Sequence, residues 1–119
     1  MSDEHPEDAG DDQAEDAQLV FGSAAQFFAE FLRYVYRRPV GTTLKWSAEW
    51  WRCDEAVLRI EALWRSWESL RQDPATGMSV WYRDHADHHM SVLLSADGPF
   101  STCRDRTAPG DPLPLCGQR

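Results

Sequence analysis

The chain has 119 residues, enough for one domain, and a formal net charge of −8. Eight of its 20 acidic residues, and no Lys or Arg, fall within residues 1–17. This stretch has too little apolar surface to offset the entropy cost of ordering, so we predict a disordered acidic tail. Without the tail, the chain has twelve acidic and twelve basic residues. That balance argues against a broad phosphate-binding surface and against a folded mimic of DNA.

The predicted cellular location follows from what the sequence lacks. No basic region followed by an apolar run stands near the N-terminus, so no secretory signal is expected. No apolar stretch reaches the roughly 18 residues that a membrane span needs. Three cysteines are too few, and odd in number, for a disulfide scaffold. We therefore predict a cytoplasmic protein that does not bind membranes.

A first helix is predicted over residues 24–38. Ser23 and Gln26 have the spacing of a capping box at its start. Pro39 and Gly41 are expected to end it. Its apolar residues recur at steps of three and four, as on one face of a helix: Ala24, Phe27, Phe28, Phe31, Leu32 and Val35.

A second, longer helix is predicted from a cap at Ser47 to about Arg71. Trp46 and Trp51 would then occupy the two positions of a hydrophobic staple around that cap. Steps of three and four again define one apolar stripe: Trp50, Cys53, Val57, Ile60, Trp64 and Trp67.

Residues 78–94 are predicted to form two short helices. Residues 78–82 also alternate as in a strand, but a lone strand would lack a partner. Asp87 is then the expected N-cap of the second short helix. The sequence thus predicts an all-α domain of three to four helices over residues 18–103, followed by an irregular Pro-rich tail over residues 104–119 that Leu113 and Leu115 pin.

All six tryptophans lie between Trp46 and Trp81. They could form an exposed patch that binds a partner or stacks on bases, or they could form the core. Their helical spacing favours the core for most of them. Trp81 is the least constrained, so we expect it to be partly exposed. With Tyr82 and Arg83 it forms the candidate interaction surface.

Residues 84–89 hold three of the four histidines. In one continuous helix His85 and His89 would share a face and could bind zinc, with Cys103 or Cys116 adding a thiolate. A cap at Asp87 would break that geometry, and neither a zincin pattern nor a C-x-x-C knuckle is present. We therefore predict no metal and no cofactor, with His85, His89 and Cys103 as weak candidate ligands.

The sequence lacks the common catalytic motifs. It has no G-x-S-x-G nucleophile elbow, no P-loop and no dinucleotide-binding fingerprint. The acidic residues of the second predicted helix have basic helical neighbours or end positions. We therefore expect no enzymatic activity and propose no catalytic residue.

Several runs of residues resemble one family. They are Glu49-Trp50-Trp51, residues 61–68, residues 73–81, residues 83–87, and Gly98-Pro99-Phe100 with Cys103. The pattern resembles an uncharacterised actinobacterial group, the domain of unknown function numbered 4913, over roughly residues 20–103. Relatives often have Pro where His88 stands, which suits the first turn of a helix capped by Asp87. The resemblance implies a small accessory protein of actinobacterial chromosomes and mobile elements, with no assigned activity.

Together these observations predict a non-enzymatic accessory protein that binds an unidentified protein partner. One alternative is a nucleic-acid-binding accessory protein, and another is a domain stabilised by zinc. Clustering of Arg33, Arg37, Arg38 and Arg52 would favour nucleic acid. An exposed patch of Trp and Phe would favour a protein partner.

Overall fold

A computed structural model describes residues 19–116, so the predicted acidic tail over residues 1–17 lies outside the described residues. Residues 19–116 contain helices, turns and loops but no strand, which confirms the all-α prediction. Three helical segments cover residues 24–35, 54–70 and 77–94. In the part of the chain that the structure describes, no helix is long and apolar enough to cross a membrane.

The first helical segment consists of α2 (Ala24–Phe27), the π-helical turn η1 (Phe28–Leu32) and α3 (Arg33–Val35). Its start confirms the predicted cap, because the Oγ of Ser23 accepts the Gln26 N–H at 3.1 Å. The side chain of Gln26 accepts the N–H of Gly22 at 2.8 Å. The segment ends three residues before the predicted Arg38.

The second helix, α4 (Asp54–Leu70), begins later than predicted. A single 3-10 turn, η2 (Trp50–Arg52), precedes it, and Cys53 is extended between the two. Ser47 is therefore not the cap of this helix. The backbone there bonds instead to the C-terminal segment: the Ala48 N–H donates to Asp105 at 2.6 Å, and the Ala48 carbonyl accepts the Cys116 N–H at 2.8 Å.

The third helical segment is continuous where two short helices were predicted. It consists of α5 (Gly77–Val80), the π-helical turn η3 (Trp81–Ala86) and α6 (Asp87–Leu94). Asp87 is not an N-cap, because its φ of −61° and ψ of −40° are helical. Its carboxylate accepts the phenolic O–H of Tyr36 at 2.9 Å instead.

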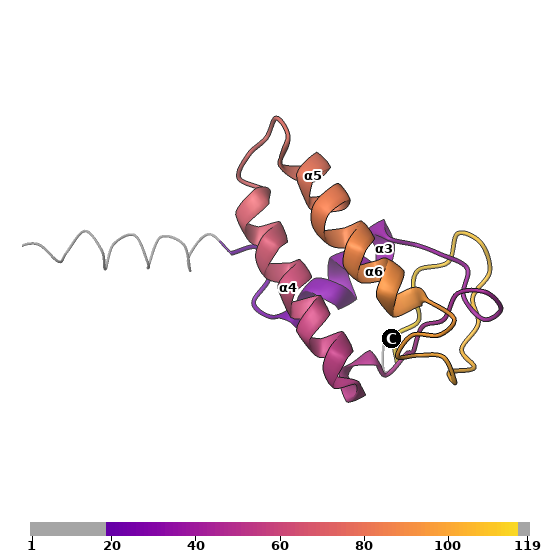
Figure 1. Cartoon of the computed structure of the whole chain (residues 1–119). Helices are drawn as coiled ribbons and strands as arrows, with labels where there is room; N and C mark the ends of the chain where they lie inside the picture. The colour runs from indigo at the N-terminus through magenta and orange to yellow at the C-terminus, as the bar shows by residue number, and fades with distance from the viewer. Residues whose placement is uncertain (1–18, 117–119) are drawn as a thin grey trace, which may run out of the picture.

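Figure 1 shows how the three segments pack. α4 and the α5–α6 segment run antiparallel side by side, and the first segment crosses behind them. The turn that joins α4 to α5 requires glycine at Gly77, where a Cβ would lie 1.8 Å from the carbonyl oxygen of Leu70. Only a residue without a Cβ allows the backbones to approach this closely.

The core between these segments is largely aromatic. Trp46 stacks on Phe28 with their ring centroids 5.4 Å apart, and its ring meets the edge of Phe100 at 5.0 Å. Trp46 is therefore a core residue, whereas Trp51 is 45% exposed, so the predicted staple between them is wrong. Core burial of most tryptophans is confirmed: Trp46, Trp50, Trp64, Trp67 and Trp81.

The segment after α6 has no helix, and it packs against the helices. Leu113 is fully buried, and its N–H donates to the carbonyl of Arg33 at 3.0 Å. The Thr107 N–H donates to the carbonyl of Val40 at 3.1 Å. The connector between the first two segments and the C-terminal segment therefore hold each other at one end of the molecule (Figure 1).

Candidate functional site

The predicted interaction surface of Trp81, Tyr82 and Arg83 is only partly a surface. Trp81 has no exposed area, and its indole N–H donates to the carbonyl of Leu63 at 3.1 Å. The expectation that Trp81 is partly exposed is therefore wrong. Tyr82 is 36% exposed, and Arg83 is exposed but pairs with Asp84 at 2.8 Å. Of the three, only Tyr82 offers an exposed aromatic ring.

Tyr82 lies beside the end of the first helical segment. Its hydroxyl reaches the carbonyl of Val35 at 3.5 Å. Val35 and Tyr34 are themselves 37% and 38% exposed, although Val35 was predicted to lie on the apolar stripe. Three large side chains with apolar surface, from two segments far apart in sequence, thus face solvent together.

Two arginines flank the ring of Tyr34. The Cζ atoms of Arg33 and Arg37 lie 4.9 and 5.6 Å from its centroid. Arg33 is only 8% exposed, and it donates to the carbonyl of Leu113 at 3.0 Å and to the Tyr34 hydroxyl at 2.8 Å. Arg37 donates to the carbonyls of Tyr34 and Gly110, at 2.8 and 2.6 Å.

A third guanidinium, that of Arg38, lies over the buried ring of Tyr36, with its Cζ 4.3 Å from the centroid. Arg38 donates to the carbonyl of Arg37 at 2.7 Å. Burial, and then the bond to Asp87, raises the pKa of Tyr36. Burial likewise raises the pKa of Tyr82. Both phenols therefore stay protonated at neutral pH, and both can donate hydrogen bonds.

We call the exposed side chains of this region the Tyr–Arg surface: Tyr34, Val35, Arg37, Arg38 and Tyr82. Within residues 19–116, none of Arg37, Arg38 and the buried Arg33 forms an ion pair with a carboxylate. Their hydrogen-bond partners are carbonyls and one phenol. Elsewhere in residues 19–116, Arg52, Arg59, Arg71 and Arg83 pair with carboxylates, whereas Lys45, Arg65, Arg104 and Arg106 do not. Among the described residues, the arginines of the Tyr–Arg surface thus form no ion pair, although the carboxylate of Asp87 lies nearby on the hydroxyl of Tyr36.

The candidate zinc ligands do not assemble. The continuous helix does place His85 and His89 four residues apart, but Cys103 lines a separate pocket. In residues 19–116, no group of three or more His, Cys, Asp or Glu side chains is arranged to hold a metal ion. His89 faces a cation, because its Nδ1 lies 2.9 Å from the Nη1 of Arg59. That neighbour disfavours a second positive charge at the imidazole.

The environment of His89 predicts a pH dependence of stability. Burial first, and then the charges of Arg59, His88 and His85, lower its pKa below the ordinary value of 6.5. The unfolded chain then binds this proton more readily, so stability should fall as pH drops from about 6.5 towards 5. Urea unfolding at pH 7 and pH 5 should show this loss, and His89→Gln should reduce it. An H89Q variant with an unchanged pH dependence would contradict the assignment.

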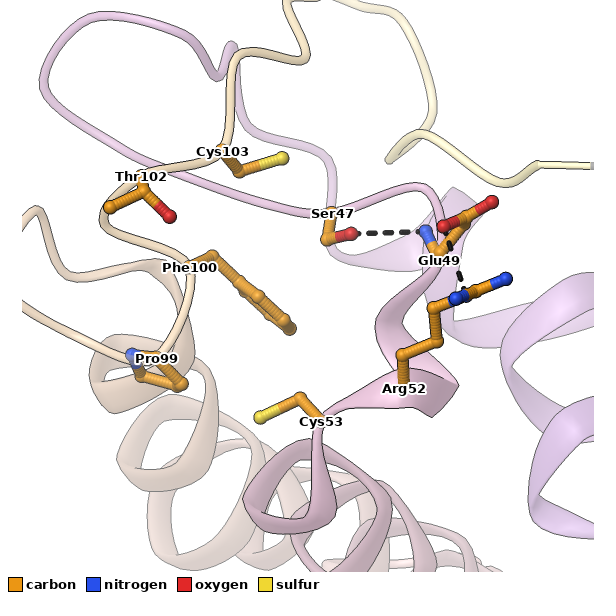
Figure 2. A pocket seen from close by; sticks show the side chains of 8 residues that line it. All are labelled: Ser47, Glu49, Arg52, Cys53, Pro99, Phe100, Thr102 and Cys103. Carbon is orange, nitrogen blue, oxygen red and sulfur yellow. Dashed lines mark hydrogen bonds and ion pairs between the residues drawn. The ribbon is translucent and has the colours of Figure 1, made fainter.

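A pocket of about 280 Å³ lies near η2, between the connector and the C-terminal segment (Figure 2). The thiols of Cys53 and Cys103 stand on different walls, and Phe100 lies between them. Its one acid, Glu49, already pairs with Arg52 at 3.1 Å. Sequence reasoning did not predict this pocket, because its walls come from segments about fifty residues apart. Its lining residues are Ser47, Glu49, Arg52, Cys53, Pro99, Phe100, Thr102 and Cys103.

Comparison with known proteins places the chain in one family. The model of the family described as Domain of unknown function (DUF4913) matches residues 21–116, most of the chain and nearly all of the described structure. No curated protein and no solved structure gave a significant match. The matched range includes every residue of the Tyr–Arg surface and of the pocket. The chain therefore belongs to the DUF4913 family.

Proposed function

We propose that the protein is a non-enzymatic binding module that uses the Tyr–Arg surface to hold an acidic segment of a partner protein. The observation that supports this is the pair of exposed guanidiniums of Arg37 and Arg38, neither of which forms an ion pair with a carboxylate in residues 19–116. A carboxylate that pairs with an exposed guanidinium forms charge-assisted hydrogen bonds, and these favour binding modestly.

The apolar part of the surface favours a peptide over a simple anion. Tyr34, Val35 and Tyr82 lie next to the arginines, and each is more than a third exposed. Tyrosine and arginine are enriched where proteins bind one another, because they combine a large contact area with directed hydrogen bonds. An acidic segment with interspersed apolar residues would satisfy both parts of the Tyr–Arg surface.

Nucleic acid is the second candidate, since three of the four arginines named for it lie together. Arg52 does not join them, because it pairs with Glu49 beside the pocket. Two guanidiniums already flank the ring of Tyr34, which limits the faces available for base stacking. These features favour the acidic protein segment.

Fluorescence anisotropy on the full chain can test the proposal. The probes are a labelled peptide of Asp and Glu interleaved with Leu and Phe, and a single-stranded oligonucleotide of similar charge. We expect the peptide to bind more tightly, with an affinity that falls as salt increases. Two exposed charge pairs at up to about 1 kcal/mol each predict a loss of roughly tenfold in the R37Q/R38Q double variant.

The matched control is R52Q, which removes an exposed arginine away from the surface and should leave the peptide affinity unchanged. A thermal melt of each variant separates lost binding from lost folding. Tighter binding of the oligonucleotide would favour the nucleic-acid alternative. Peptide binding that R37Q/R38Q leaves unchanged would refute the assignment to the Tyr–Arg surface.

A further inference from the structure

The chain itself contains a segment whose charge complements the Tyr–Arg surface. Residues 1–17 carry eight acidic side chains and no Lys or Arg. The acids come as four adjacent pairs: Asp3 and Glu4, Glu7 and Asp8, Asp11 and Asp12, Glu15 and Asp16. The Tyr–Arg surface has cations without carboxylate partners in residues 19–116. At about 0.1 M salt, the acidic side chains and the arginines would attract one another over distances of about 10 Å.

The start of the described chain lies within reach of that surface. The N–H groups of Val20 and Phe21 bind the carboxylate of Glu68 on α4, which fixes the position of the first described residues. From Ala24 to Val35 the first helical segment is about 18 Å long at 1.5 Å per residue. A chain of 18 residues spans up to roughly 60 Å when extended. The acidic segment is therefore long enough to return along this segment to Arg37 and Arg38.

We infer that acidic residues within residues 3–16 bind the Tyr–Arg surface of the same chain and compete there with an acidic partner. This rests on the proposed function for the identity of the competitor. A tethered segment faces its site at an effective concentration in the millimolar range. Even a weak contact would therefore occupy the surface until a partner with better apolar contacts to Tyr34, Val35 and Tyr82 displaced it. Only partners that bind the surface more tightly than the acidic segment would then displace it.

The experiment uses the full chain in two forms. One is the native chain, and the other has all eight acids of residues 3–16 replaced by their amides, Asp→Asn and Glu→Gln. Backbone amide spectra of the two forms at low salt should differ at residues 34–38 and around Tyr82. The differences should vanish in about 0.5 M salt, where screening acts within a few ångströms. They should also vanish when both forms carry R37Q/R38Q, and persist when both carry R52Q.

Affinity for the acidic peptide probe gives an independent readout. If the native acidic segment occupies the Tyr–Arg surface in nine-tenths of the chains, only one-tenth can bind the peptide. Neutralising the segment should then raise the peptide affinity roughly tenfold. No spectral difference at the Tyr–Arg surface, or a difference only elsewhere, would overturn the inference. Equal probe binding by both forms would also overturn it and leave the proposed function standing. A spectral change at the surface without any probe binding would support the tail contact and contradict the proposed function.

Discussion

Replacing Trp81 with alanine is expected to cost about 3–5 kcal/mol of unfolding free energy. Its side chain has no exposed area and contacts both other helical segments. It meets Phe27 edge to face at 6.3 Å, and its indole N–H donates to the Leu63 carbonyl. The substitution would leave a large cavity and remove one of the hydrogen bonds to the Leu63 carbonyl, which also accepts the Ser66 hydroxyl at 3.1 Å. Because small domains have only about 5–15 kcal/mol of stability, the variant should be close to unfolded.

Two further variants separate packing from hydrogen bonding. Trp81→Phe keeps most of the ring and loses the N–H donor, so we expect a smaller loss of about 1–3 kcal/mol. Trp51→Ala is the matched control, because Trp51 is 45% exposed and should cost about 1 kcal/mol or less. Urea unfolding followed by far-UV circular dichroism measures all three. A W81A variant as stable as W51A would show that Trp81 is not a core residue.

Trp81 also shows where sequence reasoning about this fold failed. A search for steps of three and four finds regular α-helix faces, and it located α4's buried stripe of Ile60, Trp64 and Trp67. In the third segment the buried positions Trp81 and Ala86 are five residues apart, because η3 is a π-helical turn. An α-helical pattern contains no five-residue step, so it does not connect Trp81 with Ala86.

A π-helical turn also explains why the sequence pattern did not predict the Tyr–Arg surface. The π-helical turn η1 stands directly before Arg33, and it shifts the register of everything that follows. Arg33 becomes buried, whereas Val35 becomes exposed. The Ser23 cap acts within one turn and was predicted correctly, although the Gln26 side chain bonds the N–H of Gly22 and not that of Ser23. Tyr82 was named as a surface residue, but only tertiary packing brings it beside Val35.

Two other errors arose because tertiary partners competed with local ones. Ser47 and Asp87 both have good capping side chains. In the structure the backbone at Ala48 bonds to Asp105 and Cys116, so the helix starts later. Asp87 accepts the Tyr36 hydroxyl from 51 residues away, and the helix runs through it. Sequence alone gives no means of weighing such distant partners against a local cap.

A single buried carboxylate, that of Glu68, accounts for how the N-terminal end of the domain is held. Glu68 is 4% exposed and accepts hydrogen bonds from four other residues. The donors are the N–H groups of Val20 and Phe21, the indole of Trp64 and the guanidinium of Arg71. Burial alone would raise the pKa of Glu68, but these bonds outweigh it and lower the pKa below its ordinary value of 4.5. The charged form is therefore the one that the fold stabilises.

Glu68→Gln is expected to cost about 2–4 kcal/mol at pH 7, because it removes the charge opposite Arg71 and turns one acceptor into a donor. Glu55→Gln, which breaks the half-buried pair with Arg59 at the start of α4, should cost about 1 kcal/mol or less. The stability that ionised Glu68 contributes is present above about pH 4.5 and is lost as pH falls below it. The native chain should therefore lose stability from pH 4.5 to 3.5, and E68Q should lose less. Faster amide exchange at Val20 and Phe21 in E68Q would locate the opening, whereas an E68Q variant as stable as E55Q at pH 7 would refute this role for Glu68.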